Sequence, residues 1–154
     1  MSRDSATSRL RIGSLLSILG GAGMAGAGWL KNNAVIELAS KVRLGDPTIS
    51  VPPGISPEVW ALALESYGQL YLAGAIVAGL SVFLGSFIAN GFQRKLLGGI
   101  VSIAAAIIGL IFLGTSVELG AIPIVVTLIA SACGVVGGIF MILSTRRRET
   151  GRLR

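Results

Sequence analysis

Four long runs without a charged side chain limit what this chain can fold into. They cover residues 12–30, 70–92, 96–117 and 120–144. A helix of about 20 apolar residues crosses the hydrocarbon core of a bilayer, which is roughly 30 Å thick. Charged residues make up only 13% of the chain, about half the share of a soluble domain. The sequence therefore predicts an all-α integral membrane protein, a four-helix transmembrane bundle forming a single domain over residues 1–154.

The first run has a second interpretation. It follows Arg9 and Arg11 and leads into the triplet at residues 25–27, Ala-Gly-Ala, which is the pattern of a secretory signal peptide and its cleavage site. Cleavage of residues 1–27 is therefore an alternative. Because the apolar run continues through Trp29 and Leu30 to full spanning length, we expect this helix to be retained.

The distribution of charge predicts the orientation. If the N-terminus is cytoplasmic, the inner segments hold ten basic and two acidic residues, and the outer segments hold three basic and five acidic residues. Basic residues gather on the cytoplasmic side of membrane proteins. We therefore expect a multi-pass protein of the plasma (cell) membrane with both termini cytoplasmic, an outer loop at 31–66 and a basic cytoplasmic tail at 145–154. The residues that would anchor this topology to lipid are Arg9, Arg11, Arg94, Lys95, Arg146, Arg147 and Arg148.

The outer loop contains helix signals on both sides of a proline-rich stretch. Residues 32–44 carry apolar side chains at helical spacing and end before Gly45, a typical helix-terminating residue. After the stretch, Ser56 suits a helix N-cap and Pro57 the first helical position. We therefore predict that the first two helices extend beyond the bilayer and are joined by a Pro-rich turn, with the second helix running unbroken to Phe92.

Several residues of this loop are candidates for contacts between the two helices or with another protein. Glu58 and Glu65 lie seven residues apart on one helical face, where they can pair with Lys41 and Arg43 of the opposing helix. Residues 48–52 could form a short extended edge for a neighbouring subunit. The candidates for contact with an outer partner are Ile49, Val51, Pro52, Pro53 and Trp60.

Small residues recur four positions apart in every apolar run, as in Ser17, Gly21 and Ala25. Helices in lipid associate through such small-residue grooves. The grooves indicate either packing within one chain or association between subunits. The residues we assign to helix packing are Gly21, Gly85, Ser102, Gly134 and Gly138.

The residues that usually carry chemistry are scarce. Histidine is absent, and the single Cys133 lies inside an apolar run, where we expect it to be a packing residue. The predicted spans contain no Asp or Glu; Asn90 is expected to be a cap or interface residue and Glu118 a solvated turn residue. We therefore predict no catalytic residue, no metal, no cofactor and no enzymatic activity. The basic tail lacks the aromatic or glycine pattern of a nucleic-acid-binding segment, so no nucleic-acid partner is expected.

These observations favour a non-enzymatic structural or accessory subunit of a multi-subunit membrane assembly. It would act by helix packing and through an outward-facing helical hairpin, with the lipid bilayer and other membrane subunits, or copies of itself, as partners. The main alternative is a homo-oligomeric channel, holin-like or secretion-pore component, because small and hydroxyl residues can line a pore. A signalling adaptor that uses the basic tail is a third alternative.

Overall fold

The computed structural model describes residues 3–114 and 121–145, and its secondary structure there consists of four helices. These are α1 (Arg3–Arg43), α2 (Pro57–Gly91), α3 (Lys95–Gly114) and α4 (Ala121–Leu143). All four are long and apolar enough to cross a membrane. The prediction of an all-helical fold with four helices able to span a membrane is confirmed for the described residues. Glu118, Arg146, Arg147, Arg148 and the predicted span ends at residues 117 and 120 lie outside the described residues.

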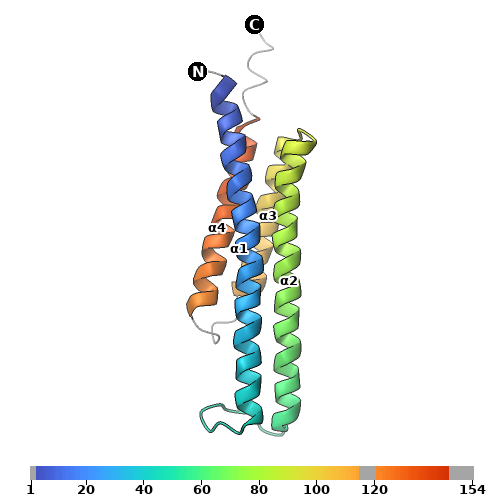
Figure 1. The fold of residues 1–154 in the computed structure, drawn as a ribbon. Helices are drawn as coiled ribbons and strands as arrows, with labels where there is room; N and C mark the ends of the chain where they lie inside the picture. The colour runs from blue at the N-terminus through green and yellow to red at the C-terminus, as the bar shows by residue number, and fades with distance from the viewer. Residues whose placement is uncertain (1–2, 115–120, 146–154) are drawn as a thin grey trace.

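The helices form an antiparallel bundle in which α1 packs against α2 and α4, and α3 also packs against α2 and α4 (Figure 1). The start of α1 and the end of α4 lie at the same end of the bundle, together with the connection from α2 to α3. Arg9, Arg11, Arg94 and Lys95 therefore belong to one end of the molecule. The two longer helices, α1 and α2, continue past the other end of α3 and α4.

The lengths of α3 and α4 are close to those of the apolar runs predicted for them, whereas α1 and α2 are longer than their runs. The 20 residues of α3 rise about 30 Å, the thickness of a bilayer core. In contrast, α1 has 41 residues and α2 has 35. The first helix is continuous through Asn32 and Asn33, so these residues do not interrupt it.

The ends of the two long helices are built from the predicted signals. Gly45 has a φ of 70°, and its N–H donates to the Val42 carbonyl while the Asp46 N–H donates to the Lys41 carbonyl. This hydrogen-bond pair is the Schellman motif that glycine commonly makes at a helix C-terminus. On the other side, the Ser56 hydroxyl accepts from the Val59 N–H, with Pro57 at the start of α2. Residues 44–56 therefore connect two firmly terminated helices.

The core of the bundle is made of small side chains. One cluster joins the four helices at mid-height, and a second lies near the end of α3. The first consists of Met24, Ala78, Val82, Ala105, Ala106 and Ala130; the second consists of Ala27, Ala75 and Leu113. Since alanine fills most of these positions, the helix backbones approach closely.

Candidate functional site

Each of the four main helix–helix interfaces contains a pair of glycines in which a Cβ on either would meet the backbone of the other. The pairs are Gly13 and Gly137 between α1 and α4, Gly21 and Gly79 between α1 and α2, Gly85 and Gly98 between α2 and α3, and Gly99 and Gly138 between α3 and α4. A Cβ atom at Gly21 would lie 2.6 Å from the Gly79 carbonyl oxygen, and one at Gly79 would lie 2.5 Å from the Gly21 carbonyl oxygen. No methyl group fits at such a distance, so the interfaces depend on glycine.

The five residues assigned to helix packing are all buried in the structure. Gly21, Gly85 and Gly138 belong to these facing pairs, a Cβ at Gly134 would contact Ala106, and Ser102 donates to the Val82 carbonyl of α2 at 3.2 Å. Their contacts lie within one chain. The small-residue grooves are thus occupied by the chain's own helices.

A polar cluster links α1 to α2 near the end of the bundle that holds the basic residues. The Asn90 amide nitrogen donates to the Ser14 hydroxyl at 2.7 Å and to the Ser86 carbonyl at 3.1 Å, and the Ser14 and Ser86 hydroxyls bond to each other. Asn90 is therefore an interface residue, one of the two roles predicted for it. Sequence analysis missed Ser14 and Ser86, because serine is frequent in these runs and nothing in its spacing marks a hydrogen-bonded pair.

Lys31 marks the level at which α3 ends. Its side chain is only 2% exposed, its ammonium donates to the Leu113 carbonyl in the last turn of α3, and it lies 4.1 Å from the centre of the Tyr71 ring. A cation at a helix C-terminus is stabilised by the unpaired carbonyls and the helix dipole. Lys31 and Tyr71 thus form the boundary between the four-helix part and the part made of α1 and α2 alone.

Beyond this boundary, residues 32–70 form what we call the hairpin arm. The arm has its own small core of Ala39, Val42 and Ala61, which are at most 2% exposed. The partly buried side chains that pack against this core are Ile49, Val51, Trp60 and Leu64. The core draws only on α1, α2 and their connection, so the arm is held together without α3 or α4.

Polar contacts complete the hairpin arm. An ion pair joins Arg43 of α1 to Glu65 of α2 at 2.7 Å, one of the pairings that the sequence allows. In the turn, Asp46 accepts from the Thr48 hydroxyl at 2.7 Å and from its N–H at 2.9 Å. These hydrogen bonds, chiefly the one from the hydroxyl, lower the pKa of Asp46, so the carboxylate that organises the turn stays ionised to a lower pH than a free aspartate.

The five residues predicted to contact an outer partner differ in how far they are exposed. Ile49, Val51 and Trp60 are partly buried against the arm's own core, Pro52 is partly buried, and Pro53 is exposed. Residues 46–49 make a turn, in which the Ile49 N–H donates to the Asp46 carbonyl, and the described residues contain no strand at 48–52. The extended edge is therefore not formed in this structure.

Several apolar side chains of the arm are exposed, among them Ile36, Leu44, Ile55 and Tyr67, and three more form a stripe on α2. Val59, Leu62 and Leu70 are 56–58% exposed and lie on one face of the helix, with the polar Ser66 between the two leucines. Sequence analysis missed these residues because the sequence alone does not show which face of α2 turns toward α1.

Within the described residues, no group of three or more His, Cys, Asp or Glu side chains is placed to hold a metal ion. Comparisons with protein-family models, with curated proteins and with solved structures gave no match to this chain. The function must therefore be argued from the bundle and the hairpin arm themselves.

Proposed function

We propose that this protein is a non-enzymatic structural subunit of a multi-subunit membrane assembly, and that the hairpin arm is the part that contacts another subunit. The four-helix part would serve as the membrane anchor. The observation that carries the proposal is the arm itself, which combines a core of its own with an exposed apolar stripe at Val59, Leu62 and Leu70.

The geometry supports placing the arm outside the bilayer. Because α3 is about as long as the bilayer is thick, the level of Lys31 and Leu113 corresponds to one membrane face. The arm continues from there for 12 residues of α1 and 14 residues of α2, about 18–21 Å. It carries ion pairs and a hydrogen-bonded carboxylate, groups that are costly to place in hydrocarbon.

The charge distribution supports an outward-facing arm. The basic residues Arg9, Arg11, Arg94 and Lys95 belong to the opposite end of the bundle, and the positive-inside rule assigns that end to the cytoplasm of the cell. Exposed apolar side chains that gather on one face of a protein mark sites where another molecule binds. A protein partner at the outer face would cover the stripe.

Crosslinking in native membranes tests this proposal. A photo-reactive amino acid is introduced at Leu62 on the stripe or, as the matched control, at Ile108 in the middle of α3, which is 64% exposed against 57% for Leu62. We expect Leu62 to give one discrete adduct with a different protein, identified by mass spectrometry, and Ile108 to give none.

Two results would contradict the proposal. Absence of any protein adduct at Leu62 would mean that the arm has no partner. Adducts of this chain with its own copies at both positions would favour the homo-oligomeric pore instead.

A further inference from the structure

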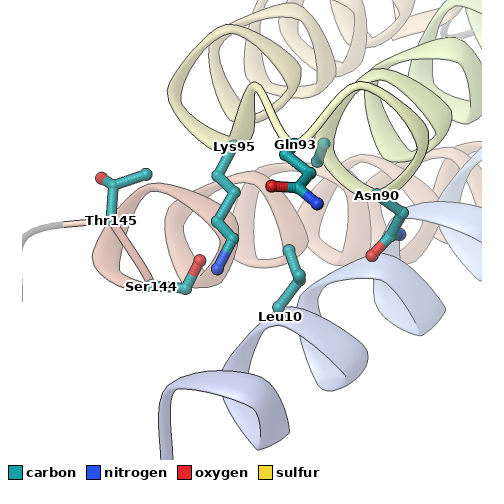
Figure 2. Close-up of a pocket in the computed structure, with 7 residues that line it drawn as sticks. Leu10, Asn90, Gln93, Lys95, Ser144 and Thr145 are labelled. Atoms are coloured by element: carbon teal, nitrogen blue, oxygen red, sulfur yellow. The ribbon is translucent and has the colours of Figure 1, made fainter. Parts of the chain in front are cut away.

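A cavity with several polar side chains in its lining opens at the end of the bundle opposite the hairpin arm. Its volume is about 320 Å³, and it lies between α1, α2, the first residue of α3 and the end of α4 (Figure 2). The side chains that matter for its chemistry are Leu10, Asn90, Gln93, Lys95, Ser144 and Thr145. This volume is at the lower end of the range for small-molecule sites, enough for a headgroup-sized ligand.

The cavity offers positive charge at one side. Among the described residues that line the cavity, Lys95 is the one with a charge, and its ammonium extends toward Ser144 (Figure 2). Because Lys95 is also the first residue of α3, the positive end of that helix dipole adds to the field. Arg94 follows Gln93 at the same end, outside the lining. The cavity therefore favours an anion.

The remaining polar groups are mostly acceptors. The Ser144 hydroxyl donates to the Met141 carbonyl at 2.6 Å, and the Thr145 hydroxyl donates to the Ile142 carbonyl. The Asn90 amide nitrogen is engaged by Ser14 and Ser86, which leaves its oxygen, turned toward Leu10 in Figure 2. A ligand that fills this cavity well would bring hydroxyl donors as well as an anionic group.

Gln93 has a strained backbone conformation. Its φ is 54°, the left-handed conformation that glycine adopts readily and other residues do not. The position follows the end of α2 at Gly91, where glycine is the usual residue. Glutamine here keeps an amide at the cavity, as Figure 2 shows. Strained residues of this kind gather at binding sites.

We propose that this cavity binds the headgroup of an anionic phospholipid that carries a phosphodiester and a free hydroxyl group. The ammonium of Lys95 and the amide of Gln93 would contact the phosphate, and the oxygens of Asn90 and Ser144 would accept from the hydroxyl. A lipid suits the site better than a free phosphate, because Leu96 and Leu97, next in sequence to Lys95, are exposed apolar residues that lipid chains can cover. This inference goes beyond the proposed function and does not depend on it.

Thermal unfolding of the full chain in mild detergent tests the site, with phosphatidylglycerol as the probe and phosphatidylcholine as the reference lipid. We expect phosphatidylglycerol to raise the unfolding temperature and phosphatidylcholine not to. Lys95→Gln should weaken the apparent affinity for phosphatidylglycerol about tenfold or more, since it removes a charge-assisted hydrogen bond. Arg94→Gln removes the same charge one residue away, outside the lining, and should change the affinity less than about threefold.

The substitution Gln93→Gly separates binding from folding. Glycine relieves the backbone strain, so the unfolding temperature without lipid should be unchanged or higher, while the affinity for phosphatidylglycerol should fall. The proposal is overturned if Lys95→Gln and Arg94→Gln weaken binding equally, because the effect is then general surface charge. It is also overturned if Gln93→Gly binds the lipid as well as wild type, or if inorganic phosphate stabilises the protein as much as the lipid does.

Discussion

Replacing Gly21 by alanine is expected to lower the free energy of unfolding by about 1–3 kcal/mol, although the change adds a single methyl group. Gly21 faces Gly79 across the α1–α2 interface, and a Cβ atom there would lie 2.6 Å from the Gly79 carbonyl oxygen. Backbone atoms cannot turn aside as a side chain can, so the two helices must move apart. Denaturant titration of the purified protein in mild detergent measures the loss.

Gly26→Ala is the matched control for this experiment. Gly26 belongs to the same helix, and a Cβ atom built on it meets nothing within 4 Å. Alanine favours helix more than glycine does, so stability should be unchanged or rise by up to about 1 kcal/mol. Equal losses for Gly21→Ala and Gly26→Ala would show that the glycines set helix flexibility rather than the distance between helices.

The second large effect is expected at Ala61, in the core of the hairpin arm. Ala61 is fully buried, so Ala61→Asp places a carboxylate in an apolar core, which costs several kcal/mol when the charge lacks a partner. The arm core shares no residue with the clusters of the four-helix part. We therefore expect the arm to open while the rest of the bundle remains folded.

Limited trypsin digestion measures this local opening. Ala61→Asp should make Lys41 and Arg43 rapidly cleavable, while most of the helical circular dichroism signal persists. Leu62→Asp introduces the same charge at the neighbouring position, which is 57% exposed, and should leave the arm as resistant as wild type. Loss of all helical structure in Ala61→Asp would contradict the account, because the arm and the bundle would then be one folding unit.

The ends of the helices could be predicted from the sequence where charged residues or turn residues mark them. Charge marks the start of α3 at Lys95, and the signals at Gly45 and Ser56 place the ends of the two long helices within one or two residues. The start of α1 was not marked in this way, because the helix begins at Arg3 and runs through Arg9 and Arg11. The prediction that α1 extends well past residue 30 depends on the amphipathic spacing after Asn32. These signals are local, and local chemistry decides where a helix begins and ends.

The packing could not be predicted in the same way, because a membrane removes the contrast between inside and outside. Lipid-facing and buried positions are both apolar, so Gly21 and Gly26 are equivalent in sequence although only Gly21 is in tight contact. Hydrophobic periodicity therefore does not show which face of a helix is buried. The facing glycine pairs become visible only when the four helices are placed together.

The burial of Lys31 and the backbone conformation of Gln93 could not be predicted from the sequence either. Lys31 stands next to the end of an apolar run and is expected from sequence to be solvated, but it is buried because the end of α3 offers a carbonyl to it. Gln93 adopts a left-handed backbone that nothing in its side chain predicts. The environment of Lys31 comes from α3, which is distant in sequence, whereas that of Gln93 comes from the short connection between α2 and α3.

The central claim is that the hairpin arm stands outside the bilayer on the outer face of the cell, and cysteine labelling tests it most directly. Single cysteines are placed at Ile55 in the arm, at Phe92 at the opposite end and at Ile108 in mid-α3, all in a Cys133→Ala background. These three side chains are 40%, 66% and 64% exposed. A membrane-impermeant maleimide is then added to intact and to permeabilised cells.

The account predicts that the cysteine at 55 is labelled in intact cells, that the cysteine at 92 is labelled only after permeabilisation, and that the cysteine at 108 is labelled in neither. Labelling at 92 but not at 55 in intact cells would show the opposite orientation. Failure to label position 55 in either preparation would place the arm within the membrane and contradict the claim.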